Sequence, residues 1–237
     1  ITSGTAITRW NDKSSNATSA VPQRGASGVA PVFSNVGGVP SIFVNNGGVN
    51  ANYNASTYAQ LQLQTNIQTT QDYSVFAVIN FNTFANSPDN QTIYSNRRGG
   101  VERAPQFGPG STFESTSTGT FRQILSGFLG TGIRQTSLVS SLASLVQLSN
   151  GAPYASVVSN LANRFTTDAD PLPTIGGTFS SVGQDNRFTT GHFHELILYN
   201  KALSTSERQQ VEGYLAEKWR TPALPTTQPY FSQRALP

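Results

Sequence analysis

Short apolar or alternating runs recur along this chain, separated by clusters of glycine, asparagine, proline and aspartate. Runs of strand length, regularly spaced and bounded by turn residues, are typical of an all-β sandwich. Asn150-Gly151, between two of the runs, is a strong signal for a tight hairpin turn. The pattern predicts strands at Pro31–Phe33, Pro40–Val44, Tyr58–Leu63, Tyr73–Phe81, Gln91–Ser95, Thr120–Ile124, Leu142–Leu148, Tyr154–Val158, Pro173–Gly176 and His192–Tyr199.

One segment, Gln135–Leu148, fits two kinds of structure. Leu138, Leu142 and Leu145 recur at a helical period, and part of the same segment also has the composition of a strand. Periodicity alone leaves both alternatives open.

The pattern changes from strand to helix near the C-terminus. Ser204 followed three residues later by Glu207 forms a capping box, in which each side chain satisfies a backbone N–H at the start of a helix. Val211, Tyr214 and Leu215, with Lys218 or Trp219, then recur at helical spacing. We therefore expect a helix over about 204–219, with one face against a sheet, ending near Arg220 and before Pro222.

Several of these segments are similar to a known family. Gly191–Trp219 resembles the C-terminal signature of concanavalin A-like (laminin G-like) jelly-roll domains. Trp10–Asn16 is similar to that family's opening Trp-x-Asp-x-Ser-Gly-x-Gly segment, with Ser15 where glycine is usual. Leu224–Tyr230 resembles the Leu-Pro-x-x-His-Pro-Tyr ending of versions found in structural proteins of large DNA viruses, with Gln228 in place of histidine. Further matches are Pro40–Phe43, Asp72–Ile79 and Ile175–Gly177.

The resemblance implies a two-sheet antiparallel jelly-roll sandwich with one short C-terminal helix, and it favours strand for Gln135–Leu148. Together with the chain length, it predicts one domain over residues 1–221. The prolines near the C-terminus predict an extended arm over 222–237 that either packs back on the domain or reaches a neighbour. The same fold hosts lectins, adhesion modules, glycanases and capsid components, so it does not decide the function.

Composition agrees with a globular domain that has a neutral polar surface. Only 11% of the 237 residues are charged, whereas 36% are hydrophobic and 14 are phenylalanine, enough for a sizeable core. Such a surface suits the outside of a cell or particle. The chain has no cysteine, which excludes disulfides, cysteine-ligated zinc and thiol catalysis. It also lacks a run of about 18 apolar residues and a signal-like N-terminus, so we expect neither a membrane span nor a targeting peptide.

The net charge of +3 does not indicate a nucleic-acid partner. The densest basic segment holds Arg97, Arg98 and Arg103, and it contains no interleaved aromatic residue on which bases could stack. This segment is either a solvated loop or a contact for an anionic glycan or neighbouring subunit.

We expect no catalytic residue. Glycan hydrolysis needs two converging carboxyl groups, and the Glu-x-Asp-x-Glu strand of related glucanases is absent. Asp168-Ala-Asp170 precedes a proline and is predicted to lie in a loop. His192 and His194 alternate along a strand, so we expect both imidazoles on one face about 7 Å apart, either half-exposed or sharing a metal. Glu195 is expected on the opposite face, where it anchors neighbouring groups.

Calcium is the one candidate cofactor. A hard cation prefers several oxygen ligands, and related domains hold calcium in rim loops. The weak candidates here are Asp168, Asp170 and Asp185, for which asparagine- or aspartate-capped turns are the alternative.

Loop aromatic residues are the candidates for sugar contact, because their rings can stack on sugar C–H faces. The predicted ligand-binding residues are Tyr53, Arg97, Arg98, Phe107, Tyr154 and Phe188; core or rim packing is the alternative for the aromatic ones. We expect structural roles for Trp10, Asp12, Glu195, Ser204, Glu207, Tyr214 and Trp219.

Three functions follow as hypotheses. The first is a non-enzymatic structural subunit of a virus, in the capsid or in host attachment, located on the virion or another extracellular surface. Its partners would be other coat subunits and polysaccharide or glycoprotein glycans. The alternative is a dedicated lectin or adhesion domain of a secreted or cell-surface protein. A glycan hydrolase is the third hypothesis.

Overall fold

The computed structural model describes residues 2–15, 18–24, 30–44, 59–65, 72–81, 92–96, 106–108, 111–115, 121–125, 132–158, 172–177, 189–222 and 224–229. The predicted site residues Tyr53, Arg97, Arg98, Asp168, Asp170, Asp185 and Phe188 lie outside these ranges.

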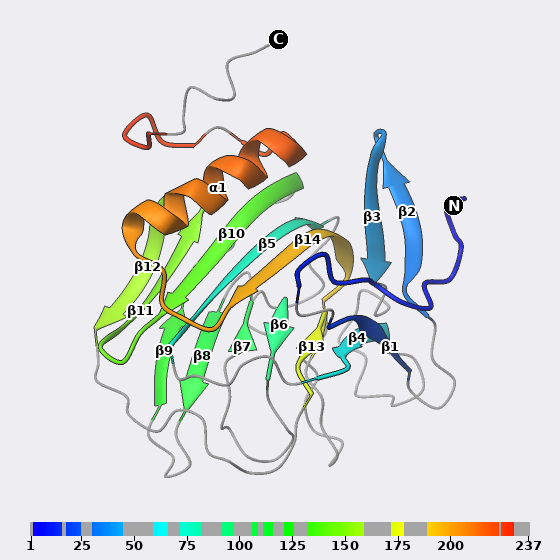
Figure 1. Cartoon of the computed structure of the whole chain (residues 1–237), viewed down its shortest axis with the longest axis horizontal. Coiled ribbons are helices and arrows are strands. Elements are labelled where there is room, and N and C mark those ends of the chain that lie inside the picture. The colour runs from blue at the N-terminus through cyan, green and yellow to red at the C-terminus, as the bar shows by residue number, and fades with distance from the viewer. Residues whose placement is uncertain are drawn as a thin grey trace.

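The described residues form two seven-stranded antiparallel sheets (Figure 1). The helix-bearing sheet has the order β12-β11-β10-β5-β14-β3-β2 and contains β2 (Val32–Val36), β3 (Val39–Val44), β5 (Tyr73–Phe81), β10 (Gly132–Ser140), β11 (Ser144–Ser149), β12 (Ala152–Val158) and β14 (Gly191–Tyr199). The second sheet has the order β1-β4-β13-β6-β7-β8-β9 and contains β1 (Ala20–Arg24), β4 (Ala59–Leu63), β6 (Tyr94–Ser95), β7 (Gln106–Phe107), β8 (Ser111–Ser115), β9 (Phe121–Leu125) and β13 (Thr174–Ile175). The expected two-sheet antiparallel sandwich is confirmed.

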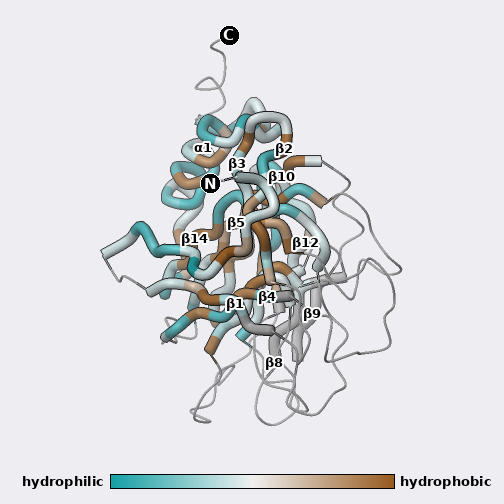
Figure 2. Tube along the Cα trace, turned by 90° about the vertical axis from the view of Figure 1, so that its right-hand side faces the viewer, coloured by the Kyte–Doolittle hydropathy of each residue, from teal (hydrophilic) through white to brown (hydrophobic). Residues whose placement is uncertain are grey.

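Strand β5 is central because it is apolar on both faces. Val75, Ala77 and Ile79 point into the core between the sheets, and Phe76 and Val78 point to the opposite face. A strand that is buried on both faces has a continuous rather than an alternating apolar sequence. Two hydrophobic clusters result, one on each side of this strand, and the side view shows the helix, the helix-bearing sheet and the second sheet as successive layers (Figure 2).

Helix α1 (Thr205–Trp219) covers the outer cluster, with Leu203 and Leu215 against Phe76 and Val78. Ser204 is its N-cap, and the predicted capping box is present. The helix ends at Arg220, whose φ of 51° and ψ of 41° are left-handed. Tyr214, which the helical spacing placed on the buried face, is instead 46% exposed. The buried positions are Glu212, Gly213, Leu215 and Ala216.

The predicted Asn150-Gly151 turn joins β11 to β12. The φ angles of 47° at Asn150 and 74° at Gly151 match a two-residue turn in which both central residues are left-handed. A Cβ atom at Gly151 would lie 2.3 Å from Nε2 of Gln228, so both the backbone angle and the available space require glycine here.

The segment with two possible structures, Gln135–Leu148, is a hairpin of β10 and β11, as the resemblance implied. The sequence pattern missed β1, β7, β8 and most of β10, whose apolar residues are sparse. The C-terminal arm packs on the domain over its described part, where Leu224 and Gln228 are buried. Within the described ranges, no helix has both the length and the apolar content needed to cross a membrane.

Candidate functional site

A β-bulge in β14 decides which of its side chains face outward. His192 pairs with Asn80 and Phe193 with Ile79, but the next partner, Val78, pairs with Glu195. His194 is therefore an extra residue in the strand. Because of this insertion, His194 and Glu195 both lie on the helix side of the sheet, whereas Phe193 packs between the sheets. The expectation that Glu195 faces away from the histidines is wrong, because simple alternation fails at a bulge.

Both histidines are buried, each with 6% exposure, rather than half-exposed. His192 stacks on Phe43 with ring centroids 4.6 Å apart, and its Nδ1 lies 3.1 Å from the Ser41 hydroxyl. His194 donates from Nδ1 to the Pro40 carbonyl at 2.9 Å, and its ring centroid is 5.3 Å from that of Trp219.

Burial lowers the pKa of both imidazoles; the neighbouring His194 lowers the pKa of His192 further, while the hydrogen bond to Pro40 partly opposes the shift at His194. Within the described part of the chain, no third metal-ligating side chain joins them. Their contacts are those of packed, neutral histidines.

Glu195 connects β14 to the last turn of α1. Its carboxylate accepts hydrogen bonds from the Tyr214 hydroxyl at 3.0 Å, from Lys218 Nζ at 3.1 Å and from the Trp219 indole N–H. Although partial burial lowers the pKa of Lys218, the hydrogen bonds from its ammonium to Tyr214 and Glu195 outweigh it and raise that pKa. Glu195 thus joins β14 to Tyr214, Lys218 and Trp219 of the helix, and the structural role of these residues stays a prediction.

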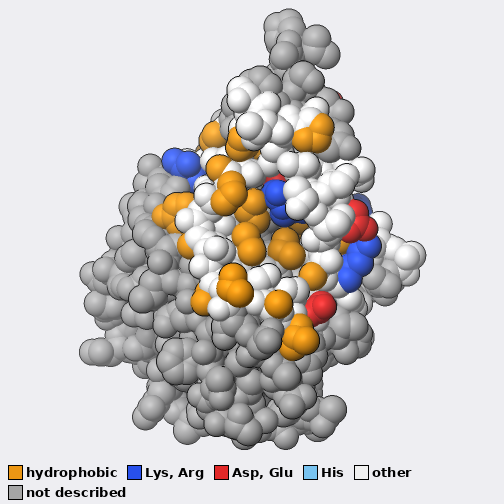
Figure 3. Space-filling view, turned by 90° about the vertical axis from the view of Figure 1, so that its left-hand side faces the viewer, with side chains coloured by type: hydrophobic (Ala, Val, Ile, Leu, Met, Phe, Trp, Pro, Cys, Tyr) orange, Lys and Arg blue, Asp and Glu red, His pale blue; other side chains and the backbone are white. Residues whose placement is uncertain are grey.

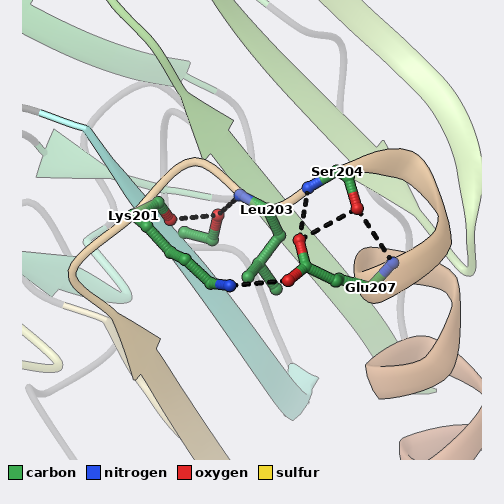
Figure 4. Close-up of polar contacts among 5 residues, drawn as sticks. Lys201, Leu203, Ser204 and Glu207 are labelled. Atoms are coloured by element: carbon green, nitrogen blue, oxygen red, sulfur yellow. Dashed lines mark hydrogen bonds and ion pairs between the residues drawn. The ribbon is translucent and has the colours of Figure 1, made fainter.

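A second polar anchor holds the start of α1 (Figure 4). Glu207 accepts from the backbone N–H of Ser204 at 2.9 Å and from Lys201 Nζ at 2.6 Å, and these interactions lower its pKa to about 2, with Lys201 the largest cause. The buried Ser74 hydroxyl of β5 donates to the Lys201 carbonyl at 3.0 Å and accepts from the Leu203 N–H at 3.0 Å. Nothing in the local sequence of Ser74 indicated this contact.

Glu212 is the buried carboxylate that the sequence analysis missed. It is 0% exposed and accepts from Arg208 Nη1 at 2.5 Å, from the Ser137 hydroxyl at 2.7 Å and from Gln228 Nε2 at 2.9 Å. Gln228 Nε2 also donates to the Gly151 carbonyl at 2.8 Å. These contacts join α1, β10, the β11–β12 turn and the C-terminal arm, and the only sequence signal for them is the i,i+4 pair of Arg208 and Glu212.

The N-terminal motif is also structural. Asp12 accepts from the Ser14 N–H at 2.7 Å and from the Thr18 N–H at 2.9 Å. Although partial burial raises the pKa of Asp12, these bonds and that of the Ser14 hydroxyl lower it overall. Trp10 forms a β-bridge with Ala20 and packs, partly buried, against the inter-sheet core.

Two of the predicted ligand-binding aromatics are described. Phe107 is 0% exposed and belongs to the core between the sheets, so the prediction of a surface ring is corrected at this position. Tyr154 on the edge strand β12 is 36% exposed, and Leu142 and Val158 are further exposed apolar residues of the β10–β12 region. Hydrophobic side chains gather on this side of the molecule (Figure 3). Partial burial raises the pKa of Tyr154, against an opposing effect of Arg134.

A row of side chains crosses the outer face of the helix-bearing sheet beside the end of α1. Successive pairs in register place one residue from each of five strands in this outer row: Val32, Phe43, His192, Asn80 and Ile133. Their neighbours Phe33, Ile42, Phe193 and Ile79 face the inter-sheet core, so the row faces outward. Ile133 packs against the cluster under the helix. Apart from His192, the members of the row are partly exposed.

A small hollow lies between β5, β14 and Tyr94. That hollow encloses about 180 Å³, part of it open solvent. Because this volume includes open solvent, the enclosed space is smaller still, well below the roughly 300–1,000 Å³ of usual small-molecule pockets. Among the described residues, the outer row is therefore the better candidate for contact with a ligand.

Comparisons with known proteins support the fold. No protein-family model matches the sequence, and no curated protein matches it significantly. Domain 4 of AbnA, a GH43 extracellular arabinanase from Geobacillus stearothermophilus solved in complex with arabinotriose, has a TM-score of 0.62 and 12% identity, over 87% of this chain and 97% of that one. The binding domain of Paraclostridial Mosquitocidal Protein 1 has a TM-score of 0.57 and 15% identity, over 90% of this chain and 51% of that one.

A third similar structure is the W1252A mutant of HCR D/C VPI 5995, with a TM-score of 0.53 and 9% identity, over 89% of this chain and 52% of that one. This chain thus spans about half the length of two of these three proteins. At such low identity the likeness concerns the fold, which is a lectin-like β-sandwich.

Proposed function

We propose that this chain is a non-catalytic carbohydrate-binding domain. The observation that carries the proposal is the likeness to the arabinotriose-bound domain of AbnA, which extends over 87% of this chain and nearly the whole of that domain. A chain that matches a complete binding module, rather than part of a catalytic domain, is expected to work by recognition.

The described carboxylates support the non-catalytic part of the proposal. Glu195, Glu207 and Glu212 each accept hydrogen bonds from a lysine or arginine and from a hydroxyl group. Hydrolysis of a glycan would need two carboxyl groups that face the same glycosidic bond. These three are occupied in holding the helix.

A structural or attachment role in a virus particle is the second proposal. It is supported by the resemblance of the Leu224–Tyr230 segment to viral relatives and by the neutral polar composition. In that case the partners would be coat subunits and the location a particle surface. The two proposals differ in whether the isolated chain binds a sugar with saturation.

A glycan array with and without chelator tests the proposed function. We expect saturable binding of at least one glycan, followed by measurable affinity for it in isothermal titration calorimetry. The absence of saturable binding on a broad array contradicts the proposal. Loss of binding on chelation would show that a metal ion is needed, and variants of the candidates Asp168, Asp170 and Asp185 would then test whether they bind calcium. Release of reducing ends from the bound glycan identifies a hydrolase instead.

A further inference from the structure

We propose that the outer row is the binding site, and that it takes a neutral oligosaccharide lying across β3, β14 and β5 beside the end of α1. This inference rests on the proposed function and adds the position and the chemical class of the ligand. It places the contact on the face of a sheet, whereas the sequence analysis placed it in loops.

The outer row combines an apolar ring and a polar amide in order along its length. Phe43 offers apolar ring surface, and Asn80, two strands away, offers an amide that can both donate and accept. Because neighbouring strands lie about 4.8 Å apart, these two side chains stand about 10 Å apart with His192 between them. The Asn80 amide and the part of the Phe43 ring that His192 does not cover can therefore contact neighbouring sugars of one short oligosaccharide.

The Phe43 ring is already held in position before a ligand binds. Phe43 stacks on His192 with an interplanar angle of 28°, and His192 is in turn fixed by Ser41. Ordering a side chain before the ligand arrives reduces the entropy lost on binding. The Asn80 amide, in contrast, makes no hydrogen bond to another described residue and keeps its capacity for a ligand.

The outer row is electrically neutral. The outer row contains no acidic or basic side chain apart from His192, whose burial keeps it neutral. On the helix side of the same sheet, Glu195 and Lys218 form an ion pair with each other at 3.1 Å. A sialylated, sulfated or uronic glycan would find no unpaired cation among these residues, so the row suits a neutral sugar.

The test measures binding of neutral trisaccharides by calorimetry to the whole chain and to two variants, Phe43→Ala and Asn80→Ala. The probes are arabinotriose, xylotriose, mannotriose and cellotriose, with sialyllactose as the anionic comparison. We expect the unchanged chain to bind at least one neutral probe more tightly than sialyllactose. Each variant should weaken that binding about fivefold or more, the effect of losing about 1 kcal/mol of contact.

Val158→Ala is the matched control, since it also truncates an exposed side chain but on the β12 edge, where Val158 is 84% exposed. It should bind like the unchanged chain. If Phe43→Ala fails to fold, Asn80→Ala still tests the site, because a partly exposed amide contributes little to the core. Thermal melts show whether each variant is folded.

The possible outcomes distinguish failure of the proposed binding site from failure of the proposed carbohydrate-binding function. If the unchanged chain binds a glycan and both variants bind it equally well, the outer row is not the site but the domain is still a carbohydrate-binding one. Tighter binding of sialyllactose overturns the neutral ligand class. Absence of binding to these probes and to the array overturns both the proposed site and the proposed carbohydrate-binding function.

Discussion

At the scale of single residues, one inserted side chain in β14 organises the outer face of the sheet. His194 is the extra residue of the bulge, and it lets Glu195 face the helix together with the histidines. A one-residue change of register reverses the face of every later side chain in a strand. Strict alternation along His192, His194 and Glu195 could not reveal this, because the bulge depends on pairing with β5.

The two buried histidines predict a loss of stability in mild acid. Their pKa is lowered in the folded protein, so the unfolded chain binds more protons below its own histidine pKa of about 6.5. The stability of the folded state is therefore full above about pH 6.5 and falls as the pH drops toward the lowered folded pKa. Urea unfolding at pH 7.5 and pH 5.0 should show a lower midpoint at pH 5.0.

The charged groups on the same face are Glu195 and Lys218, which form an ion pair with each other at 3.1 Å. Asp12 and Glu207, whose pKa values are also lowered, act only at lower pH, below their usual 3.8 and 4.5. A His192→Gln/His194→Gln double variant should show a smaller difference between pH 7.5 and pH 5.0. Equal midpoints for the unchanged chain at both values would contradict the prediction.

At the scale of elements, α1 is held by polar anchors at both ends as much as by its apolar face. Only Leu215 and Ala216 among its apolar residues are buried, and Gly213 and Ala216 are small enough for a close approach to the sheet. The capping box was readable from the sequence because its two partners are three residues apart. The exposure of Tyr214 was not, because the angle at which the helix crosses the sheet decides which of its residues are covered.

Trp219 tests how much the C-terminal anchor contributes. Trp219→Ala removes its packing on His194 and its hydrogen bond to Glu195, and we expect a loss of about 3 kcal/mol in the free energy of unfolding, the low end for an aromatic residue because Trp219 is only partly buried. Trp219→Phe keeps most of the packing and should cost about 1 kcal/mol. Urea unfolding followed by circular dichroism measures both. Unchanged stability in Trp219→Ala would show that this end of the helix is not anchored through the indole.

At the scale of the whole molecule, the C-terminal arm completes the domain. Gln228 connects it to Glu212 and to the Gly151 carbonyl, so the described part of the arm, up to residue 229, packs on the same unit as the sandwich. The sequence placed a boundary at residue 221 because prolines follow it. Over its described part this arm lies against the domain, where Leu224 and Gln228 are buried.

The Glu212 network predicts a strong effect of a single substitution. Glu212→Ala leaves Arg208, Ser137 and Gln228 without their shared acceptor, and removal of one partner from a buried ion pair costs about 3–5 kcal/mol. We expect the lower part of that range, because Arg208 retains some exposure. Glu217→Ala, an exposed acid on the same helix, is the control and should change the free energy of unfolding by less than about 0.5 kcal/mol. Similar stability for both variants in urea unfolding would contradict the proposed importance of the network.

The residues of the candidate site could not be selected from the sequence alone. Of the aromatic residues selected from the sequence, Phe107 is in the core, and Phe43 was predicted only as part of a strand. Phe43 and His192 are 149 positions apart, and only the pairing of β3 with β14 brings their rings together. The pairing register of β5 then adds Asn80 to the same row.

The amino-acid sequence by itself determined the all-β class, most of the strands, the Asn150-Gly151 turn and the capped helix. These features depend on residues within a few positions of one another, whose periodicity and hydrogen-bonding groups are visible in the chain. Only the tertiary structure decided the outward face of Glu195, the burial of Glu212 and the composition of the outer row. The reason is that strand register, a bulge and the helix crossing are set by packing between segments that are distant in sequence.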